Sequence, residues 1–233
     1  MQPVVITGNP GCGKSTVLEL LQHKGIPVWS ADHAAARLYE VGADGWHMFK
    51  SRFGSRFFMD EHGGRMDKAA LFTAMRHDGN LRREVEMLIH PLIWQNLFDF
   101  MGRHNNLHKY APLCVAEIPL YFESAGSMRR DADMSRSLSR PVVVGIHCPF
   151  AIRAERLKKS RGWTEDRIQT MESWQWDEGK KMQFADLVLD NSESAEKLAS
   201  KTEELLARLQ SMRKERLDKI LLQISGIMSC NAN

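Results

Sequence analysis

The hydrophobic positions of this chain form short runs that are separated by longer segments with helical spacing. Five of these runs are apolar on both faces and too short for helices, which is typical of buried parallel strands joined by helical crossovers. They are Val4–Thr7, Pro27–Ala31, Leu113–Ile118, Val142–His147 and Leu187–Leu189. The pattern predicts an α/β fold with a doubly wound, five-stranded parallel sheet, in which ligands gather at the carboxyl ends of the strands.

Several segments depart from this alternation and predict how one domain is organised. Residues 60–110 have apolar positions at helical spacing, and we expect a helical lobe inserted between strands. Residues 151–181 are helical with dense positive charge, and we expect a lid. Glu123–Arg140 is polar without periodicity, as in a mobile surface connection. The core is expected to comprise residues 1–59, 111–150 and 182–212, followed by a helical extension, 213–233, that runs past the sheet.

The first apolar run leads into a glycine-rich turn. Gly8-Asn9-Pro10-Gly11-Cys12-Gly13-Lys14-Ser15 matches the phosphate-loop pattern G-x-x-x-x-G-K-[ST], between an expected strand and an expected helix. In this pattern backbone N–H groups turn toward an anion, the lysine reaches the β- and γ-phosphates, and the serine hydroxyl coordinates Mg²⁺. We therefore expect a P-loop NTPase-type protein that uses ATP and Mg²⁺, with Ser15 on the metal and Cys12 as a small residue of the loop. The expected nucleotide-binding residues are Gly11, Cys12, Gly13, Lys14, Ser15 and Thr16.

Composition and charge narrow the functional classes. The 233 residues carry a formal net charge of +3, with 43% hydrophobic and 26% charged residues, which is ordinary for a globular protein. We find neither a clustered basic motif for nucleic acid nor a run close to the ~18 apolar residues of a membrane span. The four cysteines are far apart without a C-x-x-C pair, which favours free thiols. We expect a cytoplasmic monomer or weak homo-oligomer with no nucleic-acid or membrane partner.

A phosphate loop alone does not distinguish a switch, a motor and a kinase. The chain has no N-K-x-D tetrapeptide for guanine, and it has candidates for the base and lid of a small-molecule kinase. Asp32 follows the second expected strand, where a carboxylate can accept a proton or hold a water on Mg²⁺; an N-cap of the following helix is an equal alternative. Arg161 in the lid can neutralise the transferred phosphoryl, although charge runs are usually solvated helix faces.

Further motifs follow the phosphate loop in a recognisable order. They are SADHAAAR (30–37), GRMDK (64–68), EMLIHP (86–91), EIPLYFE (117–123) and QWDEGKKMQFADLVLDN (175–191). Together they resemble the dephospho-coenzyme A kinase family over roughly residues 4–205. The resemblance implies transfer of the ATP γ-phosphoryl group to the 3′-hydroxyl of dephospho-CoA, the final step of coenzyme A biosynthesis.

The resemblance also implies roles for residues outside the phosphate loop. Asp32 would be the catalytic base beside Lys14 and Arg161. Acceptor contacts would come from Arg37, His90 and Glu123, and the turn at Asn191 would lie near the adenine of ATP. In the QWDEGKKMQFADLVLDN motif, the lysine of the family pattern is matched to Lys180.

Some positions differ from the family pattern. Glu117 replaces an aspartate that could meet the metal shell, and Ser30 replaces the first aspartate of its box. The lid sequence is one residue short, so Arg156 remains an alternative to Arg161 as the lid arginine. Two rival functions also stay open: another P-loop nucleotide or nucleoside kinase, and an ATP-binding module without turnover.

Overall fold

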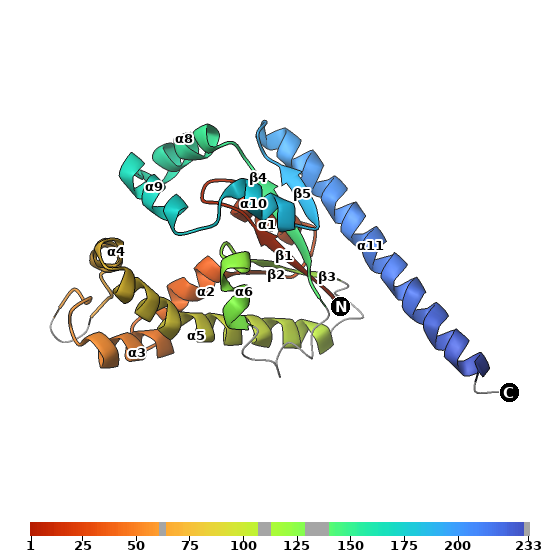
Figure 1. Ribbon diagram of the computed structural model, residues 1–233, viewed down its shortest axis with the longest axis horizontal. Helices are drawn as coiled ribbons and strands as arrows, with labels where there is room; N and C mark the ends of the chain where they lie inside the picture. Colours follow the sequence, from red (N-terminus) through yellow and green to blue (C-terminus); the bar gives the residue numbers. More distant parts are fainter. Residues whose placement is uncertain (61–63, 107–112, 129–139, 231–233) are drawn as a thin grey trace.

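The structure is a computed structural model that describes residues 1–60, 64–106, 113–128 and 140–230. Its centre is one five-stranded parallel sheet in the order β2-β3-β1-β4-β5 (Figure 1). The strands are β1 (Gln2–Thr7), β2 (Val28–Ser30), β3 (Leu113–Glu117), β4 (Val142–His147) and β5 (Leu187–Asp190). The strand prediction and the α/β fold class are therefore confirmed.

Helical segments follow every strand. They are α1 (Lys14–His23), α2 (Ala31–Leu38), α3 (Asp44–Phe53), α4 (Lys68–His77), α5 (Gly79–Asn106), α6 (Tyr121–Met128), α8 (Phe150–Arg161), α9 (Glu165–Ser173), α10 (Glu178–Phe184) and α11 (Ala195–Cys230). Because all five strands are parallel, their carboxyl ends lie at one edge of the sheet. The turns that begin α1, α2 and α6 meet at this edge.

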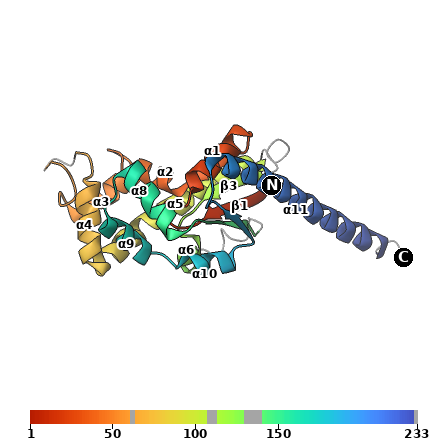
Figure 2. The same ribbon diagram turned by 90° about the horizontal axis from the view of Figure 1, so that it is seen from above.

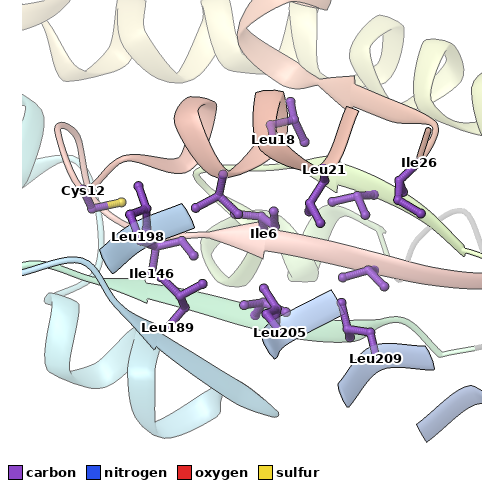
Figure 3. Close-up of a cluster of buried hydrophobic side chains, with 14 of the residues drawn as sticks. Ile6, Cys12, Leu18, Leu21, Ile26, Ile146, Leu189, Leu198, Leu205 and Leu209 are labelled. Carbon is purple, nitrogen blue, oxygen red and sulfur yellow. The ribbon is translucent and has the colours of Figure 1, made fainter. Parts of the chain in front are cut away.

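One face of the sheet is covered by α1 and the first half of α11 (Figure 3). Ile6 and Ile146 of the sheet pack with Leu21 of α1 and with Leu205 and Leu209 of α11. Each of these side chains is buried, and burying such a side chain stabilises the fold by roughly 1.5–3 kcal/mol before entropy is counted. The start of the last helix is therefore part of the core.

The opposite face is covered by α5, with α2 beside it. Trp94, Leu97 and Phe100 of α5 pack against Val5 and Ala116 of the sheet. The Trp29 indole donates a hydrogen bond of 2.8 Å to the Asn96 amide oxygen, which satisfies the polar atom of a buried ring. The long helix α5 is thus fixed to the sheet through its second half.

The first half of α5 leaves the sheet and supports a helical lobe with its own apolar cluster. Phe49 of α3, Leu71 of α4 and Val85 of α5 are buried together, with Phe58 and Met66 between them. The cluster includes α3, so the lobe draws on residues before position 60 as well. The lobe was predicted to span residues 60–110, with the core resuming at residue 111. Residues 61–63 and 107–112, which include the end of that lobe, lie outside the described residues.

The helices α6 and α11 bound two segments whose extent was expected from the sequence. The polar connection expected from Glu123 begins later, because α6 continues to Met128; the Ser124 hydroxyl donates a 2.6 Å hydrogen bond to the Leu120 carbonyl within this turn. Residues 129–139 of that connection lie outside the described residues. As expected, α11 packs on the sheet and then runs past it (Figures 1 and 2), although residues 231–233 of the tail are not described.

Leu217, Ile220 and Leu221 are exposed on the protruding part of α11. No helix among the described residues is long and apolar enough to span a membrane.

Candidate active site

Glycines shape the loop between β1 and α1. Gly11 has a φ of 78° and Gly13 a φ of 95°, a left-handed conformation that side chains disfavour. A Cβ at Gly13 would also clash with the Asn191 amide nitrogen. The N-terminus of α1 follows at once and presents its positive dipole end, so the local geometry suits a phosphate.

Lys14 is buried at the floor of this loop. Its Nζ donates hydrogen bonds to the carbonyls of Gly8 (3.0 Å) and Asn9 (3.3 Å), and only 7% of the residue is exposed. Lys14 lines a cavity of about 860 Å³ that also contains Ser15 and Thr16. This volume is in the range of ligand pockets. Cys12 is wholly buried with its thiol beneath the loop, and burial raises its pKa, so a packing role fits this residue.

Two carboxylates reach the same cavity from the neighbouring strands. Glu117 ends β3, and Asp32 lies in the first turn of α2 just after β2. The N-cap of α2 is Ser30, whose hydroxyl accepts a 3.4 Å hydrogen bond from the His33 N–H. Asp32 is therefore not the N-cap residue, and its exposed side chain lines the cavity that contains the phosphate loop.

Glu117 is the more unusual of the two acids, because 97% of its surface is buried at the strand end. Burial raises the pKa of Glu117 and the nearby Asp32 raises it further, whereas Lys14 and a hydrogen bond with Ser30 oppose the shift. A buried carboxylate beside a buried lysine is a costly arrangement that functional sites often contain.

The phosphate loop is held from outside by Asn191 at the end of β5. Its amide Nδ2 donates a 2.8 Å hydrogen bond to the Cys12 carbonyl, and the residue is buried. This position satisfies a loop carbonyl and requires the glycine at position 13. Asn191 also lines the large cavity.

The lid segment also contacts the phosphate loop, through Arg153 of α8. This arginine is 2% exposed and donates to the carbonyls of Pro10 (3.1 Å) and Cys148 (2.8 Å). It also forms a two-point ion pair with Glu172 in the last turn of α9, with N–O distances of 2.5 and 3.2 Å. The sequence analysis missed Arg153, because a buried arginine cannot be distinguished from its solvated neighbours in a basic helix.

Both candidate lid arginines line the large cavity. Arg161, the last residue of α8, is exposed and lies over the Trp163 ring at 5.6 Å. Arg156, in the middle of α8, has its guanidinium 3.4 Å from the Cys148 sulfur and 3.5 Å from the Glu193 carbonyl oxygen. Arg161 also lines the smaller cavity that contains Asp32, Ser15 and Glu117, and Arg156 does not.

The residues expected on the acceptor side are divided among several places. His90 lines a small apolar cavity of about 190 Å³ together with Asp32, and burial lowers its pKa, partly offset by Glu86. Glu123 lines the neighbouring cavity that His90 shares. Arg37 is exposed at the end of α2. In the part of the chain that the structure describes, it does not line the four cavities that contain Asp32 or His90, so it lies apart from the other site residues.

A buried lysine connects Glu123 to the centre of the site. The Nζ of Lys181 lies 3.0 Å from Glu123 Oε1 and donates to the Pro119 carbonyl (2.8 Å) and the Gln175 side chain (2.9 Å). Burial lowers its pKa, and Glu123 opposes that shift. The sequence comparison singled out Lys180, but that residue is exposed and lies over the Trp176 ring.

Comparison with known proteins agrees with this arrangement. The family model for dephospho-CoA kinase matches residues 3–197. The chain belongs to the dephospho-CoA kinase family. A dephospho-CoA kinase of Rhodopseudomonas palustris (strain BisB18) is 26% identical over 93% of this chain and 100% of its own length. One from Bdellovibrio bacteriovorus is 28% identical over 92% and 100%, respectively.

Two solved structures share the fold of this chain. The crystal structure of TT1252 from Thermus thermophilus has a TM-score of 0.69 and 30% identity, covering 90% of this chain and 99% of its own. The dephospho-CoA kinase from Campylobacter jejuni has a TM-score of 0.61 at 20% identity, with 93% and 100% covered, and so shares the fold.

Membership in the dephospho-CoA kinase family makes this chain an ATP-using phosphotransferase with an alcohol group as the acceptor. The family match ends at residue 197, before Leu205 and Leu209 of α11, which are buried in the core. The dephospho-CoA kinase core is thus completed here by a helix that lies mostly beyond the matched region.

Proposed function

We propose that this chain is a dephospho-CoA kinase that phosphorylates the 3′-hydroxyl of dephospho-CoA with ATP, the last step of coenzyme A biosynthesis. The observation that carries the proposal is one continuous cavity that contains the phosphate loop, Asp32, Glu117 and Arg161. A phosphoryl donor and an alcohol can meet there, which is what in-line transfer requires.

In this proposal Asp32 orients the ribose hydroxyl and accepts its proton. The freed oxygen attacks the γ-phosphorus, the bond from that phosphorus to the β–γ bridging oxygen breaks, and ADP leaves with the electron pair. Lys14 and the backbone N–H groups of Gly11 to Ser15 stabilise the β- and γ-phosphate oxygens. Arg161 shields the charge that develops on the transferred group.

The donor set fits a magnesium ion. The Ser15 hydroxyl and the carboxylates of Asp32 and Glu117 line one cavity of about 500 Å³, and Mg²⁺ prefers such oxygen ligands, completed by waters and substrate phosphates. Ser15 would hold the ion directly and Glu117 through its water shell. The ion would supply charge neutralisation at the phosphate oxygens. The positive charge of Lys14 acts on Glu117 and favours its ionised form.

The remaining assignments concern binding. Asn191 would fix the loop next to the adenine of ATP, Thr16 would contact its phosphates, and His90 and Glu123 would lie on the acceptor side. Arg37 would need a shift of α2 to take part. We further propose a cytoplasmic enzyme, monomeric or weakly self-associating and without nucleic-acid partners. The single domain would consist of the core, lobe, lid and extension predicted from the sequence.

The proposed function is tested by replacing the base. Asp32→Asn is expected to keep ATP affinity and to lower kcat by at least ~100-fold, the usual effect of losing a general base. Calorimetric titration with ATP and an ADP-release assay with dephospho-CoA measure the two quantities. Asp44→Asn, an exposed acid in the first turn of α3, is the matched control. Near-normal turnover of Asp32→Asn would remove Asp32 from this role.

The rival functions are separated by the acceptor. ADP release with dephospho-CoA is compared with release in the presence of AMP, CMP, shikimate or gluconate. Preference for another acceptor would make the chain a different P-loop kinase. ATP binding without acceptor-dependent ADP release would make it a binding module.

A further inference from the structure

The reaction cavity and the small apolar cavity share part of their walls. The reaction cavity of about 860 Å³ contains the phosphate loop, and the apolar cavity of about 190 Å³ contains His90. The described residues that line both are Asp32, Pro119, Met171 and Gln175. A group that passes from the phosphate loop to an alcohol beside Asp32 has to cross the junction that these residues form.

Gln175 supplies the polar side chain of the junction that faces the proposed base. The Pro119 carbonyl is already occupied, because it accepts hydrogen bonds from the Thr7 hydroxyl (3.1 Å) and the Lys181 ammonium (2.8 Å). The thioether at position 171 is only a weak acceptor. Besides the Asp32 carboxylate, the junction therefore offers one amide side chain.

Lys181 fixes which end of the Gln175 amide is available. The Lys181 Nζ lies 2.9 Å from the amide oxygen of Gln175, and an ammonium group can only donate, so the oxygen has to be the atom at that position. The other donors of Nζ go to the Pro119 carbonyl and to Glu123, 3.0 Å away. The three protons of the buried ammonium are thus all used, and the orientation of the amide is set from below.

The amide nitrogen of Gln175 keeps two N–H donors. In the part of the chain that the structure describes, this Nε2 has no hydrogen-bond partner. Because the oxygen is turned to Lys181, the nitrogen is the end that can donate into the two cavities. Preoriented N–H donors stabilise a transition state when they face the atoms on which charge develops.

We infer that the Gln175 amide donates hydrogen bonds to the oxygens of the transferred γ-phosphoryl group and is a further catalytic residue. The inference rests on the proposed function, because the junction is the place of transfer only when an alcohol lies at Asp32. Lys14 and the loop hold the phosphoryl group on the donor side, and Gln175 stabilises it as it moves toward the acceptor. The bonds that form and break are those given above, and the amide gains and loses no proton.

The test compares ATP with ADP, since only ATP carries a γ-phosphoryl group. In Gln175→Glu one carboxylate oxygen keeps the contact with Lys181, and the other puts a negative charge in the place of the N–H donors. We expect the Kd for Mg²⁺·ATP to rise about 10-fold or more because like charges repel, and the Kd for Mg²⁺·ADP to stay within about twofold. Calorimetric titration without acceptor measures both constants.

Gln175→Leu removes the donors without adding a charge, and it serves if the first variant does not fold. Its kcat with dephospho-CoA is expected to fall by about 100- to 1,000-fold, the usual effect of losing one donor to the transition state. The KM for dephospho-CoA should stay close to that of the wild type, because the contact forms with the transferred group. Steady-state ADP release measures kcat and KM.

Gln183 provides the matched controls. It is exposed on the neighbouring helix α10 and is not among the described residues that line either cavity. Gln183→Glu and Gln183→Leu make the same chemical changes away from the junction and should alter none of these constants. Thermal unfolding of all four variants shows which of them keep the fold.

The outcomes are distinct. Equal losses of ATP and ADP affinity in folded Gln175→Glu would overturn the inference, because the amide would then act on the phosphate loop as a whole. A raised KM for dephospho-CoA with unchanged kcat and ATP affinity would also overturn it, because the amide would then contact the acceptor. If the wild-type chain does not turn over dephospho-CoA but Gln175→Glu still separates ATP from ADP, the proposed acceptor is wrong and the γ-phosphoryl contact stands.

Discussion

Glu117 is a single residue whose burial at the site lowers the stability of the fold. Its carboxyl is buried at the end of β3, and that burial raises its pKa above the usual value for a glutamate. The burial of this carboxyl therefore disfavours its charged form in the folded protein. The carboxylate near the phosphate loop is therefore present at the expense of stability, as is common for active-site residues.

The pH dependence of stability follows from this shift. The folded state binds a proton on Glu117 more tightly than the unfolded state does, so the stability is greatest below the unfolded pKa and falls as the pH rises through the folded pKa. We expect Glu117→Gln to raise the Tm at pH 8, by about 2–4 °C for each 1 kcal/mol gained. Near pH 4 the two proteins should melt together, because the wild-type carboxyl is then protonated.

This prediction is measured by thermal unfolding without nucleotide over a range of pH, with Glu204→Gln on the exposed surface of α11 as the control. The same variant should bind Mg²⁺·ATP less tightly. A Tm that falls at every pH would mean that the ionised carboxylate stabilises the fold.

Individual residues were predictable where their type and spacing carry the chemistry. Lys14, Ser15 and Asp32 stand in fixed positions relative to the glycines and the strand ends, so the motif placed them in the cavity. Arg153 and Lys181 could not be found, because only burial distinguishes them from neighbouring surface cations. Asn191 was identified by the family motif, but its hydrogen bond to the loop depends on a contact distant in sequence.

At the level of elements, the lid is connected to both of its neighbours. Arg153 connects α8 to the phosphate loop, and Asn9 of that loop donates a 3.0 Å hydrogen bond to Glu172. On the other side, the Arg167 guanidinium lies over Phe72 of the lobe at 4.7 Å and over Trp163 at 4.8 Å. The lid segment therefore has contacts through which donor and acceptor sites can affect each other.

Arg153 should contribute strongly to the stability of this connection. Arg153→Met removes the cationic partner of Glu172, which keeps only its hydrogen bond from Asn9, and removes the donors to the Pro10 and Cys148 carbonyls. We therefore expect a loss of about 3–5 kcal/mol, as for other broken buried pairs. The Tm should fall by roughly 6 °C or more, and the KM for ATP should rise.

Lys158→Gln provides a comparison in the same helix. Lys158 pairs with Glu165, and both side chains are about half exposed, so its Tm should stay unchanged. Differential scanning calorimetry of the two variants measures both Tm values. Equal Tm values for Arg153→Met and wild type would contradict the predicted role of Arg153 in stability.

Strands were predicted more accurately than the start of the connection after β3. A short run that is apolar on both faces is typical of a buried strand, and all five runs are strands of the one sheet. The polar segment from Glu123 lacks periodicity, yet its first residues continue α6, whose turn is stabilised by hydrogen bonds from Ser124 and by Glu123 with Lys181. Such local tertiary contacts cannot be deduced from polarity.

On the scale of the whole molecule, α11 has two different halves. Leu209 is 1% exposed beneath the sheet, whereas Leu221 is 63% exposed on the protruding half. Leu209→Ala is expected to cost about 2–5 kcal/mol, the range for buried leucines. Leu221→Ala should leave the stability within about 0.5 kcal/mol.

Urea unfolding curves of the two leucine variants measure this difference. Both variants should retain the wild-type KM values, because neither residue lines the cavities of the site. Comparable destabilisation by both variants would show that the protruding half of α11 is stabilised by contacts absent from one isolated chain.

The placement of α11 affects how the chain folds during its synthesis. On the ribosome β1 and the phosphate loop emerge early, but the leucines that cover them emerge only after nearly the whole chain has been made. Until then the apolar face of β1 and α1 stays open to water and to other chains, as in partly folded intermediates. We expect nascent chains halted before Leu205 to be held by chaperones and to be unable to retain ATP.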